Sequence, residues 1–371
     1  MKDKHINIDN NKEVLMSNMN LLKLIALILV VVGHSTGPYG NGWTYNSEVP
    51  SNLYKFILSY VGSFHLVIFV YVSGLTYAYG RIKRKSYKTY WQLIKKKFNR
   101  LILPYLLVGS LYVIPIAMIL NLDGDNNYYM NLKNFILGYD NGHLWYLLML
   151  FVVFLIYYFI EKKMTTTKNI TLVTIIFLGI YLISLKGPQL FEINTAMNYL
   201  LFFHLGYCSY LYKDRIFLIV NNILERYKGL IIVSSIFLIV IMMLIKSKLP
   251  YIKAITWGIY KIIDIVIAIL GVVQAYTLVL IINKTKFVDK LNKFNKYNFS
   301  IYLLHEPLIY IILSHLLPLN AKPTIVVLLC FSLSITTSIL ISKIYYYFIK
   351  YLNKIFRCKF KIREFKKFIN N

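Results

Sequence analysis

Long apolar runs alternate with short polar segments along almost the whole chain. A helix needs about 20 mostly apolar residues to cross the hydrocarbon core of a bilayer, and ten runs approach that length. The ten predicted spans are residues 17–37, 54–79, 101–120, 143–160, 169–185, 197–212, 230–245, 258–282, 298–317 and 324–347. The pattern therefore predicts an all-α integral membrane protein, a polytopic bundle of about ten transmembrane helices.

The first apolar run, 21–32, ends in Gly33-His34-Ser35 and lacks the small-residue pattern of a cleaved signal peptide. We therefore expect a retained first helix. Prolines inside later spans are compatible with this assignment, because neighbouring helices can satisfy the backbone groups that a proline frees. The predicted organisation is a cytoplasmic N-terminal segment over 1–19, a membrane domain over 20–347 and a basic cytoplasmic tail over 348–371.

Composition supports the membrane prediction. Hydrophobic residues make up 58% of the 371-residue chain and charged residues 15%, with a mean hydropathy of +0.57. Ordinary soluble domains carry about 25% charged residues. These values exclude a soluble, disordered or fibrous protein and override the two or three soluble domains that length alone would suggest. The three cysteines have no spacing typical of a metal site or disulfide framework, so no metal is expected.

The formal net charge of +27 comes from basic residues between the apolar runs. This distribution is typical of cytoplasmic loops in membrane proteins, and no nucleic-acid recognition motif accompanies it, so no nucleic-acid partner is expected. The 80–100 loop is basic and contains no acidic residue. With ten spans, this loop, the 284–297 loop and the tail lie on one side, which predicts that both termini are cytoplasmic. The lysines of the 246–253 loop depart from that pattern. The composition suits a bacterial plasma membrane.

Ionisable residues occur inside several predicted spans, where they are expensive and each is a functional hypothesis. The histidines in or beside spans are His34, His65, His143, His204, His305 and His315, and Asp264, Glu306 and Lys343 join them. A neutral histidine that bonds two helices together is an ordinary structural alternative. Lys261 and Asp264 are three residues apart, and we expect them to neutralise each other.

Lys23 and His34 are eleven residues apart on the first predicted helix. Eleven helical steps leave an offset of about 20° and a rise of about 16 Å, so both side chains project from one face. On spacing alone two interpretations stay open. Either the pair is functional, or Lys23 extends to the inner interface and His34 marks the outer one.

Six short motifs resemble the membrane acyltransferase 3 family, closest to its polysaccharide O-acetyltransferase branch, which is related to fucose 4-O-acetylases. They are Lys23 followed after ten residues by His34, Phe64-His65 with Ser73-Gly74, Arg100 with Pro104-Tyr105, Leu144-Trp145, Phe203 with Leu205-Gly206, and Ser300 with Tyr302, His305 and Pro307. Asn20 and Val67 depart from the family pattern, which has Asp and Pro there. Each motif is weak, but their order along the chain is specific.

The resemblance implies acetyl transfer from cytoplasmic acetyl-CoA to a hydroxyl of a cell-surface polysaccharide or lipid-linked glycan. His34 is then the general base, or the residue that briefly carries the acyl group. His65, His305, Tyr302 and Trp145 are candidates to stabilise the developing oxyanion, without ranking. We expect catalytic residues His34, Lys23, His65 and His305, donor-binding residues Arg100 and Lys23, and substrate-binding residues Trp145 and Tyr302.

An exporter or transporter of a polysaccharide or lipid-linked glycan is the competing hypothesis, because intramembrane histidine and aspartate also suit proton-coupled transport. The chain shows no paired half repeats of the kind that many transporters contain. The expected partners are a saccharide acceptor, membrane lipids and other polysaccharide-synthesis proteins.

Overall fold

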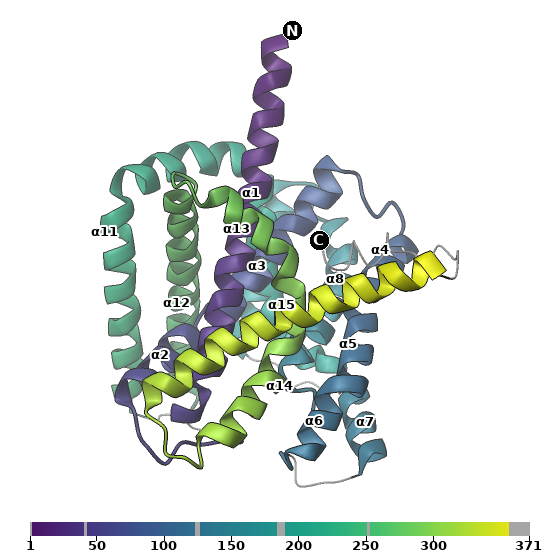
Figure 1. Ribbon diagram of the computed structural model, residues 1–371. Helices are drawn as coiled ribbons and strands as arrows, with labels where there is room; N and C mark the ends of the chain where they lie inside the picture. Colours follow the sequence, from purple (N-terminus) through teal and green to yellow (C-terminus); the bar gives the residue numbers. More distant parts are fainter. Residues whose placement is uncertain (1, 41–42, 123–126, 184–189, 251–252, 356–371) are drawn as a thin grey trace. The chain divides into compact units, whose positions relative to one another are not determined.

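The computed structural model describes residues 2–40, 43–122, 127–183, 190–250 and 253–355. All regular secondary structure in these ranges is helical, as the apolar pattern predicts (Figure 1). Residues 356–371, which include Cys358 and most of the predicted basic tail, lie outside the described residues. The predicted domain boundaries therefore stay predictions.

Eight helical segments in the described part of the chain are long and apolar enough to cross a membrane. They are Ser17–Tyr39, Asn52–Lys83, Tyr90–Ile119, Tyr128–Glu161, Asn222–Lys248, Ile255–Ile282, Val288–Leu316 and Pro323–Phe348. Each contains one of the predicted spans almost entirely. The protein is a multi-pass membrane protein.

The two other predicted spans are helices that do not reach that standard. Helix α9 (Thr167–Ile183) has 17 residues, one short of the 18 that define a candidate span. Helix α10 (Ile193–Leu211) is long enough at 19 residues, but polar side chains such as Asn194, Asn198 and His204 lower its hydropathy. The described residues therefore contain eight candidate spans, and a count of ten stays a prediction.

Three segments predicted as polar loops contain helices: α4 (Tyr90–Lys97), α7 (Tyr128–Leu137) and α13 (Val288–Phe294). Helix α4 begins where the Thr89 side chain accepts a hydrogen bond from the backbone N–H of Gln92, which satisfies one amide at the helix start. Hydropathy alone missed these helices because capping residues and short polar turns, not apolar length, define them.

The described residues fall into two units, each interrupted in sequence. The first unit comprises Met1–Gly62, Leu111–Asn126 and Thr285–Asn371. Its helices are α1 (Lys2–Thr36), α2 (Asn52–Gly62), α6 (Ile114–Ile119), α13, α14 (Asn298–Leu316) and α15 (Pro323–Ile355). Helix α1 packs against α2, α14 and α15, and α14 and α15 form a helical hairpin (Figure 1).

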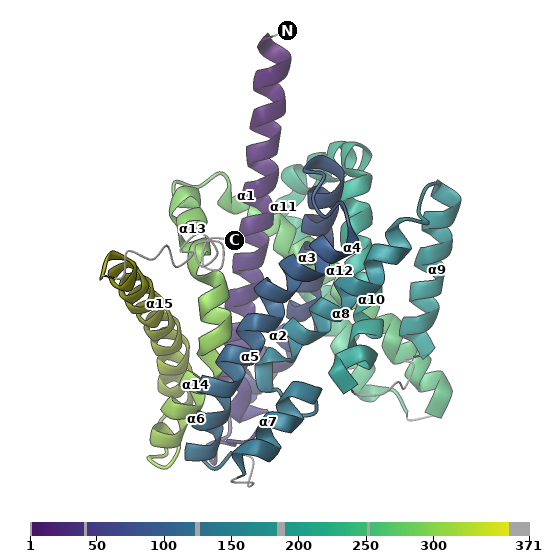
Figure 2. The same cartoon turned by 90° about the vertical axis from the view of Figure 1, so that its right-hand side faces the viewer.

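The second unit comprises Ser63–Ser110 and Asn127–Lys284. Its helices are α3 (His65–Ala78), α4, α5 (Leu103–Val108), α7, α8 (Trp145–Glu161), α9, α10, α11 (Lys213–Lys248) and α12 (Lys253–Ile282). Helices α11 and α12 lie side by side in Figure 1, and Figure 2 shows α9 next to α10.

Helices α3 and α10 cross at two glycines. A Cβ atom added at Gly74 would lie 2.0 Å from the carbonyl oxygen of Phe203, and one at Gly206 would lie 1.9 Å from the carbonyl oxygen of Tyr71. Backbone therefore contacts backbone at this crossing, which is the packing that small residues permit in membranes. Ser73-Gly74 and Phe203 with Leu205-Gly206, two separate motifs in the sequence, form one helix–helix contact.

Asp264 pairs with a residue other than the one predicted. Lys246 Nζ lies 2.5 Å from Asp264 Oδ1 and joins α11 to α12. Lys261 instead places its ammonium over the rings of Tyr181 and Trp257, at 4.8 Å and 5.0 Å from their centroids. Asp264 still acts electrostatically on Lys261 as predicted, but its direct salt bridge is with Lys246, because the neighbouring helix offers a better-placed cation. Lys246 was predicted to lie in the 246–253 loop but belongs to the last turn of α11, and this contact gives it a structural role.

Candidate functional site

Two helices of the first unit bring together two histidines and a carboxylate. His34 lies in the last turn of α1, and His305 and Glu306 lie in α14. His34 Nδ1 is 3.5 Å from Glu306 Oε1, and the ring centroids of His34 and His305 are 4.9 Å apart. The side chain of His34 keeps 19% of its surface exposed and that of Glu306 keeps 10%. The predicted catalytic residues His34 and His305 are therefore neighbours.

The surroundings of each ring determine which nitrogen carries the proton. His305 Nδ1 lies 3.0 Å and 2.9 Å from the carbonyl oxygens of Ile301 and Tyr302. Carbonyl oxygens only accept, so Nδ1 donates and the lone pair of neutral His305 is at Nε2. The negative charge of Glu306, 3.5 Å from His34 Nδ1, favours a proton on that nitrogen and leaves His34 Nε2 as the basic nitrogen. His305 can donate from Nε2 to an oxyanion only when it is protonated.

Aromatic side chains of the same unit surround this pair. Trp43 meets His34 edge to face, with ring centroids 5.2 Å apart, and lies 5.7 Å from Tyr310. The Tyr310 hydroxyl lies 3.5 Å from Glu306 Oε1 and donates to it. A Cβ atom at Gly37 would lie 2.2 Å from the Trp43 indole, so Trp43 packs directly on the backbone after α1. These rings limit the access of water to His34.

The remaining predicted residues of this unit lie on the same two helices. Lys23 is half-buried on α1, eleven residues before His34, so one continuous helix carries both as the spacing predicts. Tyr302 is buried one turn before His305, with ring centroids 6.1 Å apart. The Tyr112 hydroxyl donates to the carbonyl oxygen of Leu304 at 3.1 Å, next to the place where Pro307 interrupts the hydrogen bonds of α14.

Arg100 lies in the second unit, in a π-helical turn over Phe98–Ile102. Its side chain is exposed, whereas Lys97 is 7% exposed with its ammonium 3.3 Å from the ring centroid of Phe154. Burial raises the pKa of the nearby Tyr87 phenol above its ordinary value of 10, and the positive charges of Arg100 and Arg84 oppose that rise. A guanidinium and an ammonium within this basic segment suit an anionic group.

His65 and Trp145 also belong to the second unit. His65 is the first residue of α3 and is 9% exposed. Trp145 begins α8 with its ring centroid 6.1 Å from that of Tyr199, and the adjacent Tyr146 hydroxyl lies 3.4 Å from Ser73 Oγ. The structure groups His34, His305, Lys23 and Tyr302 in one unit and His65, Arg100 and Trp145 in the other.

His204 is held by hydroxyl groups on both sides. Its Nδ1 lies 2.8 Å from the Tyr157 hydroxyl and its Nε2 lies 2.9 Å from Thr174 Oγ1. Thr174 donates its proton to the carbonyl oxygen of Ile170, so it accepts from His204 Nε2–H and Tyr157 donates to Nδ1. With its residue surface fully buried, neutral His204 bonds α8, α9 and α10 together.

Two other motif residues have structural contacts. The ring of Tyr105 stacks on Phe135 at 4.3 Å between centroids, and its hydroxyl donates to the Phe135 carbonyl oxygen. Ser300 Oγ lies 3.2 Å from Ser342 Oγ and joins α14 to α15. Packing and contacts between helices therefore account for a tyrosine at 105 and a serine at 300.

From sequence alone, Glu306, Trp43 and Lys97 have only general roles: an ionisable residue inside a span, an aromatic residue of the interface or of a sugar site, and one member of a basic run that could supply cations to the donor. Glu306 follows His305 directly, and an acidic residue beside a histidine in an apolar run was the available signal. Lys97 ends α4 directly before the π-helical turn that carries Arg100, and the run Lys95–Lys97 does not reveal from sequence which lysine is buried. Only packing separates buried Lys97 from exposed Lys95 and Lys96.

The fold and this arrangement of side chains define a multi-pass helical membrane protein with a histidine–carboxylate pair suited to proton transfer. The model of an acyltransferase domain, that of the acyltransferase 3 family, matches residues 16–343. Because the match covers most of the chain, the chain belongs to the acyltransferase 3 family, and it is a membrane-bound acyltransferase. No curated protein and no solved structure gives a match.

Proposed function

We propose that the chain transfers an acetyl group from cytoplasmic acetyl-CoA to a hydroxyl of a cell-surface polysaccharide or lipid-linked glycan. Membership of the acyltransferase 3 family supplies the reaction class. The observation that carries the proposal is the 3.5 Å approach of His34 Nδ1 to Glu306 Oε1, because it leaves Nε2 as a base for an alcohol. The motifs of the polysaccharide O-acetyltransferase branch support the choice of acceptor.

His34 takes the proton of the acceptor hydroxyl at Nε2 while the hydroxyl oxygen bonds to the acetyl carbonyl carbon. Glu306 holds Nδ1–H and stabilises the positive charge that the ring gains. His305, when protonated at Nε2, donates to the carbonyl oxygen as that atom gains negative charge. The carbon–sulfur bond then breaks, and His34 returns the proton to the departing thiolate. The products are an acetyl ester and a free thiol.

The cations of both units have roles in this proposal. Arg100, exposed in its π-helical turn, binds an anionic part of the donor, and Lys23 contributes a second positive charge. His65, Trp145 and Tyr302 orient the donor or the acceptor. With ten spans and cytoplasmic termini, the 80–100 loop is cytoplasmic and Trp43 is outside. Impermeant thiol labelling of Trp43→Cys and Lys85→Cys tests this orientation, since external reagent should reach position 43 and not position 85.

Acetyl transfer by the purified full-length chain in nanodiscs is the direct test. His34→Ala should lower the rate about 10²–10⁴-fold, the usual contribution of a general base, with unchanged thermal unfolding. Lys23→Ala should impair transfer, and Lys23→Arg should keep much of it because the positive charge remains. A normal rate in His34→Ala contradicts the assignment of the base.

The alternative role of His34, as transient carrier of the acyl group, gives a separate signature. A covalent carrier releases one equivalent of free CoA from acetyl-CoA before any acceptor is added. A general base releases none. A rapid-quench measurement of free thiol without acceptor therefore distinguishes the two roles.

The exporter hypothesis predicts a different cellular result. Mass spectrometry of the surface glycan in His34→Ala cells should show lost acetylation per sugar and normal glycan amount if the chain is the transferase. Normal acetylation per sugar with less surface glycan would favour export.

A further inference from the structure

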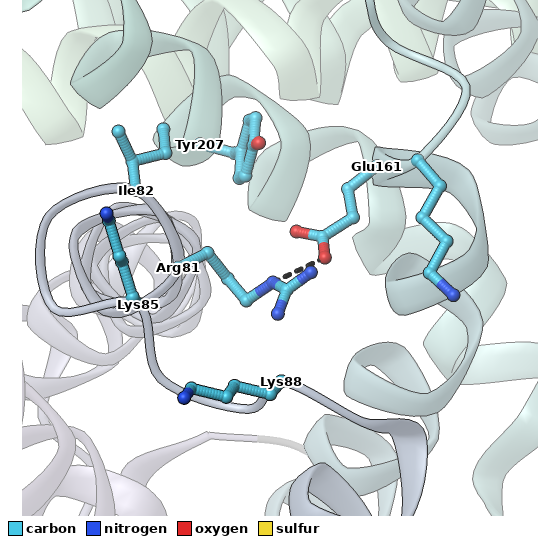
Figure 3. A pocket seen from close by; sticks show the side chains of 7 residues that line it. Arg81, Ile82, Lys85, Lys88, Glu161 and Tyr207 are labelled. Atoms are coloured by element: carbon cyan, nitrogen blue, oxygen red, sulfur yellow. Dashed lines mark hydrogen bonds and ion pairs between the residues drawn. The ribbon is translucent and has the colours of Figure 1, made fainter.

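A pocket in the second unit lies outside the arrangement used for the proposed transfer. It has a cavity volume of about 350 Å³ (Figure 3). The side chains that line it come from the π-helical turn that follows α3, the loop after that turn, the end of α8 and the C-terminal part of α10. They are Arg81, Ile82, Lys85, Lys88, Glu161, Lys162 and Tyr207.

The lining carries four cationic side chains and one carboxylate. Arg81 Nε donates to Glu161 Oε1 at 2.5 Å, and the Glu161 side chain is only 5% exposed. The carboxylate of Glu161, the single negative charge of the lining, is thus paired with Arg81, as the contact drawn in Figure 3 illustrates. Lys85, Lys88 and Lys162 leave the pocket with an excess of positive charge.

Arg81 also holds the loop that carries two of these lysines. Its Nη1 donates to the carbonyl oxygens of Ser86, at 3.2 Å, and of Tyr87. Lys85 and Tyr87 have positive φ angles of 48° and 58°, which few residues other than glycine adopt without compensation. Arg81 itself lies in a π-helical turn over Tyr79–Lys83, a conformation common at functional sites. The loop is thus fixed with its lysines at the pocket.

The tyrosine ring beside the pocket brings two of the cations together. The guanidinium carbon of Arg81 lies 5.2 Å from the ring centroid of Tyr158, and Lys162 Nζ lies 4.4 Å from the same centroid. Cations that share one ring repel each other, and this repulsion is weakly screened where the side chains are partly buried. An anion in the pocket offsets that repulsion, so the arrangement favours a bound anion.

We propose that this pocket binds a phosphate group of a phosphomonoester or phosphodiester ligand. Lysine ammonium groups and the outer nitrogens of Arg81 can each donate to phosphate oxygens. Two sources carry this chemistry: the nucleotide part of an acyl-CoA donor and the headgroup of an anionic lipid. The proposal concerns binding alone and stands whether or not His34 is the base.

The test measures binding to the full-length protein in nanodiscs of uncharged phosphatidylcholine. The probes are 3′,5′-ADP, which carries the two phosphate positions of the CoA nucleotide, and soluble dihexanoyl-phosphatidylglycerol, each titrated by calorimetry. Wild-type protein should bind at least one probe. Preference for 3′,5′-ADP assigns the pocket to the donor, and preference for the lipid assigns it to the membrane. Binding of neither probe overturns the proposal.

Charge-matched variants separate the pocket from the general basic surface. Lys85→Gln with Lys88→Gln removes two lining charges and should weaken the preferred probe about tenfold for each ammonium group, or about a hundredfold together. Lys95→Gln with Lys163→Gln removes the same charge from exposed positions outside the lining, and should change binding less than twofold. Equal weakening by both pairs contradicts a specific pocket.

A third variant should act in the opposite direction. Glu161→Gln removes the only carboxylate of the lining but keeps an oxygen that accepts from Arg81. Binding of the preferred probe should become several-fold tighter, with thermal unfolding as a check that the chain stays folded. Weaker binding by a variant that remains folded would contradict the electrostatic argument. His34→Ala should leave probe binding unchanged, so failure of this proposal and failure of the transfer proposal are distinguishable.

Discussion

His34 and His204 are both histidines on apolar helices, but their surroundings differ in every respect that matters for chemistry. His204 is fully buried, and a hydroxyl lies against each ring nitrogen. His34 keeps part of its surface exposed and faces a carboxylate, a second imidazole and an indole. A neutral histidine with two satisfied nitrogens joins helices, whereas one held by a carboxylate can take a proton at its other nitrogen.

The comparison shows that residue type and position in a span do not separate chemistry from packing. Among the histidines predicted to be functional or structural, His315 is exposed in the last turn of α14 with Nδ1 2.8 Å from the Ile311 carbonyl oxygen. His143 is buried in the short helix before α8. The distinguishing feature is whether a charged partner fixes one nitrogen while the other stays near open surface.

The largest expected effect on the transfer rate comes from replacing Glu306, the carboxylate beside His34. Glu306→Gln keeps the shape but removes the charge that favours Nδ1–H on His34, so we expect acetyl transfer to fall about 10²-fold. Glu192→Gln is the matched control, since Glu192 accepts from Asn141 at 3.2 Å in the other unit. The measurement is the rate as a function of pH with the acceptor saturating. An unchanged rate and pH profile would show that Glu306 does not position His34.

The next effect concerns the helix crossing beside His204. Gly206→Ala places a methyl group against the Tyr71 carbonyl, so we expect a loss of about 1–3 kcal/mol in stability from overpacking. Gly179→Ala, where no atom lies within 4 Å of the added Cβ, should leave stability nearly unchanged. Thermal unfolding in detergent measures both. Equal behaviour of the two variants would contradict the close approach of α3 and α10.

A smaller effect is expected at the indole that covers His34. Gly37→Ala places a Cβ inside the Trp43 ring, so the indole must move, and we expect about a tenfold loss of transfer rate as His34 becomes more hydrated. Gly33→Ala is the control, because its nearest neighbour would be a Val61 methyl at 3.9 Å. Quenching of Trp43 fluorescence by acrylamide should increase in the first variant only. An increase in both variants would mean that the helix end itself is disturbed.

The smallest effect is on the network of His204. Thr174→Val removes one hydrogen-bond partner of a buried imidazole, and we expect a stability loss of about 1–2 kcal/mol. The rate of transfer per folded molecule should stay within twofold of the wild-type rate. Thermal unfolding and the transfer assay, run on the same preparation, measure both quantities. A large loss of transfer rate without destabilisation would indicate that His204 takes part in catalysis, as proposed for His34, and would contradict a purely structural role.

The fold could be predicted to a large extent from hydropathy. In the described part of the chain each of the ten predicted ranges is mostly helical, because apolar length is a property of the sequence itself. The helices α4, α7 and α13 were missed because short polar helices depend on caps and on packing. The direct salt bridge of Asp264 with Lys246 was missed because a contact within one helix competes with contacts to neighbouring helices, and sequence spacing contains no information about the latter.

The sequence by itself determined the class of protein, the order of its apolar helices, the membership of the family, and the placement of Lys23 and His34 on one helix, because all of these follow from composition, local periodicity and motif order. Only the tertiary structure decided that Glu306 faces His34, that His204 is enclosed by hydroxyls, that Lys97 is buried while its neighbours are exposed, and that four cationic side chains and one carboxylate line the Arg81 pocket. Each of those facts depends on side chains that are distant in sequence, and packing brings them together through contacts that no local pattern encodes.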